Sequence, residues 1–431
     1  MDASPVPATP PCDPPSGAPR AGRLPFAVRI LAWASYFNDV ASELVYPLLP
    51  TLLTGELGAG RTVLGLIEGI AETVSSVLKP VAGSLSDRWS RRKGFVVVGY
   101  GLAAAARPLM GWVSRPWMVL AARTGDRIGK GLRSAPRDAM IADSTPESMR
   151  GRAFGLHRAL DHLGAATGPL VAFAMLEYFR ADLTTVFAAS AVPGIVVVLL
   201  VGWGVRETRR AGPRAESVDR SPRTGAPIGA VRTGSRALGR PFFAFLAAVL
   251  VFSLGNSSDL FVLVRAEEIG VPLAHLPLLW SYFHIVKSVG AYAAGAAVDR
   301  LGPRRLVLGG WVVYAVLYAA FAVARSPSQI WGMVALYAVF HALSEPAERA
   351  LIAHLVGENQ RGRAFGWYHF TNGIGALPAS LAFGAIYERW GAPFAFGWAS
   401  SLALIASVIF LTAFGIGSGR RSVQESGAAS A

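Results

Sequence analysis

The feature that most constrains this chain is a series of apolar segments, each long enough to cross a membrane. A helix needs about 20 mainly apolar residues to span about 30 Å of hydrocarbon. Twelve segments reach this length, six on each side of a polar stretch. They lie near residues 26–54, 62–86, 94–113, 117–142, 151–178, 183–205, 241–264, 275–298, 304–324, 328–355, 363–387 and 392–416. The sequence therefore predicts an all-α membrane protein with twelve transmembrane helices.

Composition supports this class. Of the 431 residues 52% are hydrophobic and 16% are charged, whereas about 25% are charged in ordinary soluble domains. The net charge of +14 does not indicate a nucleic-acid partner, because the arginines cluster in short connectors between apolar segments. Cys12 is the single cysteine, which excludes an intramolecular disulfide and a cysteine-based metal site. We expect no metal and no cofactor.

The distribution of arginine and lysine predicts the orientation of the chain. Every second connector is rich in Arg, as in Arg88, Arg91 and Arg92, while the alternate connectors hold about one each. The richer side is expected to be cytoplasmic, which places both termini there, in an inner or plasma membrane. The predicted organisation is a disordered tail at 1–25, a six-helix bundle at 26–205, a basic linker at 206–240, a second bundle at 241–416 and a tail at 417–431.

The two halves of the chain repeat each other. The element Gly83–Arg88 recurs as Gly295–Arg300, 212 residues later. The segment Arg150–Gly155 recurs letter for letter as Arg361–Gly366, 211 residues later. A duplicated pair of six-helix units predicts a substrate site between them, near the middle of the membrane.

The repeated Gly-x-x-x-Asp-Arg-x-x-Arg-Arg element resembles motif A of the major facilitator superfamily. Leu120–Arg123 resembles the fourth-helix motif of that family, with Arg127 as a competing match for its arginine. Gly164–Pro169 resembles the fifth-helix motif of drug–proton antiporters, with Ala172 and Phe173 where a glycine pair is usual. The resemblance implies two pseudo-symmetric six-helix bundles, secondary transport by alternating access, and antiport.

Motif A is expected to form a cytoplasmic gate. An aspartate at a helix end can pair with an arginine or with the positive end of a neighbouring helix, and such a latch can break when the halves rock. The alternative is that these charges only set topology. The expected gate residues are Gly83, Asp87, Arg88, Arg91, Gly295, Asp299 and Arg300. Gly164, Gly168 and Pro169 are interpreted as a helix-packing motif that allows close approach and a bend.

Charged residues within the predicted spans are the candidates for the substrate and proton pathway, because such groups normally face a hydrated cavity or one another. One interpretation is a set of fixed ion pairs that position helices. The other is that some carboxylates exchange protons while arginines bind the solute. The candidates are Asp39, Glu43, Glu68, Glu72, Arg123, Asp126, Arg127, Lys130, His157, Asp161, Asp259, His284, Lys287 and Glu345.

The leading hypothesis is proton-coupled export of a small polar, anionic or amphiphilic solute by a monomeric carrier in the lipid bilayer. Uptake of an organic anion or a metal chelate, by proton symport or by facilitation, is an alternative. A different class, a membrane-embedded lipid enzyme or a receptor that no longer transports, is also open. The sequence has no Cys nucleophile, zinc motif or phosphate-binding glycine loop, so we do not expect an enzyme.

Overall fold

The structure is a computed structural model that describes residues 24–89, 92–146, 149–205, 238–356 and 360–415. All regular structure within these residues is helical, and the expected all-α class with twelve spans in two bundles is confirmed. The expected linker and both expected tails fall outside the described residues, except for a few residues at their inner edges. Their boundaries stay predictions.

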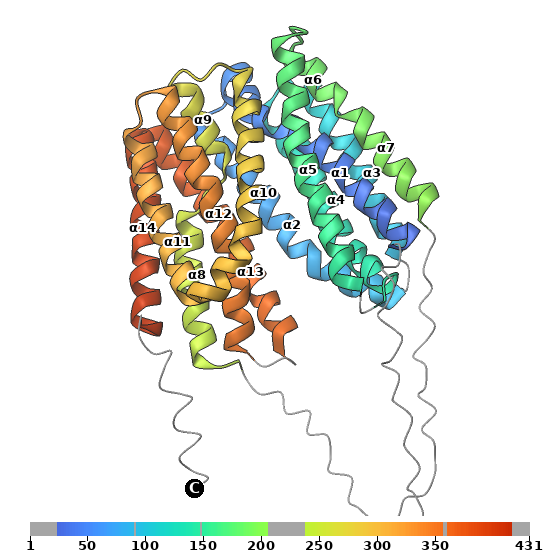
Figure 1. Ribbon diagram of the computed structural model, residues 1–431. Coiled ribbons are helices and arrows are strands. Elements are labelled where there is room, and N and C mark those ends of the chain that lie inside the picture. Colours follow the sequence, from blue (N-terminus) through green and yellow to red (C-terminus); the bar gives the residue numbers. More distant parts are fainter. Residues whose placement is uncertain (1–23, 90–91, 147–148, 206–237, 357–359, 416–431) are drawn as a thin grey trace, which may run out of the picture.

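The first half of the described chain contains six spans (Figure 1). A short 3₁₀ turn and a π-helix extend the first span, at the position of Pro47. The sixth span is made of two consecutive helices. The elements are α1 (Phe26–Val45), η1 (Tyr46–Leu48), η2 (Thr51–Glu56), α2 (Arg61–Trp89), α3 (Arg92–Leu109), η3 (Met110–Trp112), α4 (Pro116–Asp143), α5 (Arg150–Glu177), α6 (Leu183–Ala189) and α7 (Ala191–Gly204).

The second half also contains six spans, and its first span, the seventh of the chain, is broken in the middle. Single glycines with positive φ join two pairs of helices. Gly302, at 79°, lies between Leu301 and Pro303, and Gly391, at 88°, lies between Trp390 and Ala392. Glycine adopts this conformation without steric cost. The elements are α8 (Arg240–Gly255), α9 (Leu260–Glu268), α10 (His275–Leu301), α11 (Pro303–Val323), α12 (Pro327–Leu355), α13 (Arg361–Trp390) and α14 (Ala392–Phe414).

Helix starts follow from local sequence. Pro116, Pro241, Pro303, Pro327 and Pro393 occupy first-turn positions, where a missing backbone N–H costs nothing. Ser326 and Gln329 form a capping box at α12. Asp182 caps α6 by accepting from the Thr185 backbone N–H at 2.9 Å. These hydrogen bonds hold the pKa of the exposed Asp182 carboxyl below its usual value.

Six segments of the described chain are long and apolar enough to cross a membrane by composition alone: Arg92–Trp112, Arg152–Glu177, Leu183–Gly204, Arg240–Glu268, Pro303–Val323 and Ala392–Phe414. The remaining spans include α2, α12 and α13, which supply most of the lining of the central cavity described below. Their lower hydropathy has a physical reason, because a helix that faces a hydrated cavity carries polar side chains there.

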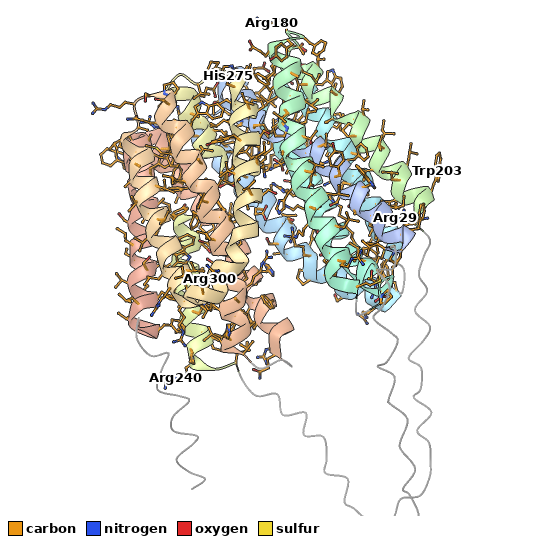
Figure 2. All side chains as sticks on the ribbon, in the orientation of Figure 1. Arg29, Arg180, Trp203, Arg240, His275 and Arg300 are labelled. Atoms are coloured by element: carbon orange, nitrogen blue, oxygen red, sulfur yellow. The ribbon has the colours of Figure 1, made fainter. Side chains whose placement is uncertain are left out.

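The two halves meet at one end and diverge toward the other (Figure 1). Arg180 and His275 lie at the end where the halves meet, and Arg240 and Arg300 lie at the opposite end (Figure 2). Helix α2 of the first half and helix α13 of the second half pack closely against each other. A Cβ at Gly65 would collide with the Ser380 carbonyl oxygen, so the glycine permits this approach.

Candidate functional site

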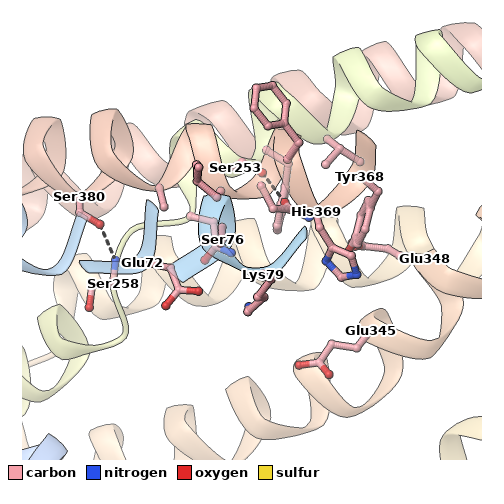
Figure 3. Close-up of a pocket in the computed structure, with 18 of the residues that line it drawn as sticks. Glu72, Ser76, Lys79, Ser253, Ser258, Glu345, Glu348, Tyr368, His369 and Ser380 are labelled. Atoms are coloured by element: carbon pink, nitrogen blue, oxygen red, sulfur yellow. Dashed lines mark hydrogen bonds between the residues drawn. The ribbon is translucent and has the colours of Figure 1, made fainter. Parts of the chain in front are cut away.

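A cavity of about 840 Å³ lies between the two halves, on the side toward the repeated motif A elements. From the first half, α2 lines it with Glu68, Glu72, Ser76 and Pro80, spaced by four along one helical face. The second half contributes from α8, the break after it, α12 and α13. Figure 3 shows Glu72, Ser76 and Lys79 on α2, opposite residues from α12 and α13.

The cavity is closed at its far end by polar contacts between the halves. Arg61 at the start of α2 forms an ion pair with Glu268 at the end of α9. Within the second half, Glu268 also accepts from the Tyr387 hydroxyl at 2.6 Å. A second contact between the halves is made by Glu388, which accepts from the Thr62 backbone N–H at 2.8 Å. These contacts, with the glycine approach of α2 and α13, join the halves on the side away from motif A.

A buried network of ion pairs holds the first half together. Arg123 forms a two-pronged pair with Glu68, at 2.7 Å from Nε and 3.1 Å from Nη2. Its Nη1 lies 3.3 Å from Asp126, which also pairs with Arg107 at 2.9 Å. Arg107 donates further to the Asn38 carbonyl oxygen at 3.0 Å. All four charged side chains are more than nine-tenths buried, and each charge has a partner, as burial requires.

The second half uses neutral donors in the corresponding region. Asp259 accepts from the Tyr337 hydroxyl at 2.6 Å. Glu348 accepts from Trp311 Nε1 at 3.0 Å and from the Tyr368 hydroxyl. Neither carboxylate forms an ion pair within the described part of the chain. Both line the cavity, so its second wall presents negative groups that carry no cation of their own.

One titratable pair bridges the halves. Glu43 of α1 accepts from Trp280 Nε1 of α10 at 2.8 Å, and His284 Nε2 lies 3.8 Å from the same carboxylate. The His284 Nε2 atom is buried and has no hydrogen-bond partner among the residues that the structure describes. The Glu43 carboxylate therefore takes part in a contact between the two bundles.

The structure separates the pathway residues expected from sequence into two groups. Five line the cavity: Glu68, Glu72, Arg127, Asp259 and Glu345. Nine lie outside its lining: Asp39, Glu43, Arg123, Asp126, Lys130, His157, Asp161, His284 and Lys287.

Some members of the second group pair with a cavity-lining residue or with one another. Lys287 pairs with the cavity carboxylate Glu345 at 2.6 Å. Within the first group, Arg127 lies 3.9 Å from Glu72. His157 lies 3.5 Å from Asp161, which also accepts from the Ser35 hydroxyl. Some of the charged residues therefore fit the interpretation as structural ion pairs, and others fit the interpretation as groups of the transport pathway.

Gly164 and Gly168 lie in α5 against α1. A Cβ at Gly168 would lie 2.5 Å from the Val40 carbonyl oxygen, and one at Gly164 would collide with that of Tyr36. Pro169 lies inside the same helix.

Much of motif A lies outside the residues that the structure describes. Arg91 lies outside the described residues, as do the side chains of Asp87 and Asp299, and of Gly295 only its position within α10 is described. The predicted latch therefore stays a prediction. Arg88 and Arg300 are exposed at the ends of α2 and α10, while Gly83 lies within α2 near Ala135 of α4.

Neutral polar residues on the cavity wall were missed by sequence reasoning, which followed charge. Ser253 donates to Asn372 Oδ1 at 2.6 Å across the wall. Their spacing in the sequence could have indicated them. A cavity-lining residue recurs every four positions on α13, at Tyr368, Asn372, Ala376 and Ser380. Arg107 was also missed, although a lone arginine inside an apolar span is a signal in itself.

A cavity between two six-helix bundles, closed at one end, is the architecture of a secondary transporter that works by alternating access. The family model of the Major Facilitator Superfamily matches residues 31–285 and 260–429. The chain belongs to the Major Facilitator Superfamily, as its motifs predicted. It is a multi-pass membrane transporter.

Two relatives illustrate the similarity in sequence. An uncharacterized MFS-type transporter of Methanocaldococcus jannaschii is 29% identical over 395 residues, which cover 89% of this chain and 94% of that protein. The multidrug resistance protein MdtH of Salmonella newport is 22% identical over 349 residues, covering 80% of this chain and 82% of that protein.

Solved structures share the fold at low identity. The nucleoside transporter NupG has a TM-score of 0.72 at 13% identity, covering 90% of this chain and 99% of that chain. A bacterial homolog of the human lysosomal transporter Spinster has a TM-score of 0.70 at 14% identity, covering 90% and 96%. For a D-xylose–proton symporter the TM-score is 0.68 at 16% identity, with 89% and 95% covered. These likenesses concern the fold alone.

Proposed function

We propose that this transporter moves a small polar, charged or amphiphilic solute through the central cavity, with proton coupling and in the direction of export. The observation that carries the proposal is a cavity of about 840 Å³ between the halves with five carboxylates in its lining. A cavity of this size accommodates a small molecule. Carboxylates that alternate between hydrated and buried surroundings are a physical route to proton coupling.

The orientation belongs to the same proposal. Arg88 and Arg300 lie at the end toward which the cavity is placed, and Arg-rich connectors favour the cytoplasmic side. The described state then faces the cytoplasm, in an inner or plasma membrane, with the closed end outside. A single chain contains both halves and is sufficient for the transport cycle.

Glu43 and His284 are the proposed coupling pair. They belong to different halves, and among the described residues Glu43 accepts a hydrogen bond only from Trp280, which is also in the second half. Protonation of Glu43 would weaken its contact with α10 and so favour separation of the halves at this level. Glu68, in contrast, would have to leave its two-pronged pair with Arg123 before it could carry a proton.

The direction of export rests on the relatives named multidrug resistance proteins. Uptake by symport is the second candidate, since a D-xylose–proton symporter shares the fold. The two directions differ in one observable. An imposed proton gradient drives solute against the proton flow in an antiporter and with it in a symporter.

The test is reconstitution in lipid vesicles, with flux of a panel of labelled solutes measured with and without a pH gradient. Solute flux that follows the gradient is expected for the wild type. Glu43→Gln should reduce that dependence, whereas Asp182→Asn, an exposed carboxylate outside the cavity, should keep it. A wild-type flux that ignores the gradient would reject proton coupling, and no solute flux at all would reject the transport proposal.

A further inference from the structure

The seventh span is interrupted where it borders the cavity. The helix α8 ends at Gly255, and α9 begins at Leu260. All four residues of the break, Asn256 to Asp259, line the cavity. Non-helical backbone at membrane depth is tolerated where it faces a cavity. The C-terminal end of α8 carries the negative end of its helix dipole and the N-terminal end of α9 carries a positive one. The formal negative charge at the break comes from Asp259, at the cap position of α9.

Oxygen atoms without partners gather at this break. Ser257 is 5% exposed and Tyr318 is fully buried. Neither hydroxyl has a hydrogen-bond partner among the described residues. The Tyr318 ring lies 6.0 Å from the ring of Tyr337, whose hydroxyl donates to Asp259. Buried polar atoms without partners are costly. Asp259 adds a carboxylate that forms no ion pair with the described residues.

The first half has a buried arginine at a position where the second half has a tyrosine. The helices α3 and α11 begin 211 residues apart, as do α4 and α12. At this spacing Arg107 corresponds to Tyr318 and Asp126 corresponds to Tyr337. The first half therefore has an arginine that neutralises a buried carboxylate and contacts the first span at Asn38. In the second half, two tyrosines with ring centroids 6.0 Å apart occupy these positions.

We propose that the break in the seventh span binds a small monovalent cation, held by the Asp259 carboxylate with oxygen atoms of Asn256, Ser257 and Tyr318. The bound cation supplies the positive charge that Arg107 supplies in the first half. Broken helices in transporters offer such oxygen sites to Na⁺. A protonated amino group of a solute would bind to the same oxygen atoms. Binding of an inorganic cation does not depend on the proposed function, whereas binding of a solute's amino group does.

The experiment measures thermal unfolding of the full chain in detergent at constant ionic strength. Choline chloride, whose cation is too bulky for such a site, is replaced by sodium chloride or by methylammonium chloride. For the wild type we expect the unfolding temperature to rise by about 2 °C at saturation. A rise with sodium assigns an inorganic ion, and a rise with methylammonium alone assigns the amine of a solute. No rise with either overturns the proposal.

Variants locate the effect. Asp259→Asn should abolish the rise, and Ser257→Ala and Tyr318→Phe should reduce it. The matched control is Glu348→Gln, which removes another cavity carboxylate that pairs only with neutral donors, and it should keep the rise. A rise that persists in Asp259→Asn contradicts the proposal; if that variant does not fold, an undiminished rise in both other variants contradicts it equally. Loss of pH-dependent flux would leave this result unaffected, so the two proposals can fail separately.

Discussion

The two halves share one fold but stabilise their interiors by different means. In the first half, Glu68, Arg123, Asp126 and Arg107 form a continuous buried ion network. In the second half, the comparable positions on α11 and α12 hold stacked aromatic side chains, such as Tyr314 and Tyr318 with ring centroids 4.0 Å apart. The fold does not require either solution. Both solutions give the buried carboxylates hydrogen-bonding partners.

The difference also separates rigidity from responsiveness. A buried charge that loses its partner is strongly destabilising, so the ion network of the first half tolerates few rearrangements. Carboxylates held by neutral donors, such as Glu348 with Trp311 and Tyr368, can gain a proton without breaking an ion pair. Four predictions test this contrast, in order of decreasing expected effect.

The largest effect is expected for Asp126→Leu. This change leaves Arg107 without its carboxylate and should destabilise the chain by about 3–5 kcal/mol, measured by thermal unfolding in detergent. The control is the double variant Arg107→Leu with Asp126→Leu, which removes both charges and should recover a large part of the loss. If the double variant loses the sum of the two single losses, the two residues do not act as a pair.

Gly65→Ala should disturb the place where the halves meet. The added Cβ would collide with the Ser380 carbonyl oxygen, and overpacking of this kind costs about 1–3 kcal/mol. Because the clash exists only while α2 and α13 are in contact, we expect the closed end to open more often. Distances between spin labels placed on those two helices measure this. Gly101→Ala, with open space around its Cβ, should leave the distances unchanged.

Tyr368→Phe should have an intermediate effect. It removes the hydroxyl that donates to Glu348, and a buried acceptor left without that donor costs about 1–2 kcal/mol. Thermal unfolding in sodium-free choline chloride measures the loss. Tyr318→Phe is the matched control, because the Tyr318 hydroxyl has no hydrogen-bond partner in the described part of the chain and its removal should be nearly neutral there. Equal losses in the two variants would contradict the role of the donor to Glu348.

The smallest effect is expected for Asp182→Ala, which removes the side-chain cap at the start of the sixth span. The last span of the second half has no such cap and starts after Gly391. Hydrogen bonds from Thr185 lower the pKa of the folded Asp182 carboxyl. Its contribution is therefore present at neutral pH and is lost as the pH falls through that pKa. Unfolding temperatures of variant and wild type should differ slightly at neutral pH and converge in acid. A difference that grows in acid would contradict this sign.

Sequence alone determined the class, the family and the number of spans. Apolar length is a local property, and a span at residues 117–142 was predicted where the structure has Pro116–Asp143. Motif repetition 211–212 residues apart determined the duplication. The candidate charges could also be named from sequence, because ionisable residues inside apolar spans are rare. Their partners could not, since Arg123 and Glu68 are 55 positions apart and only packing of α2 against α4 brings them together.

Tertiary structure decided which polar groups face the cavity and which support its wall. Asp126 and Asp259 have the same chemistry in the sequence, but one is buried between two arginines and the other lines the cavity beside tyrosines. The break at residues 256–259 likewise lies inside an apolar segment whose length alone predicts a continuous span. The physical reason is that hydrophobicity places a segment in the membrane, whereas the rotation and contacts of each helix decide what its polar side chains meet.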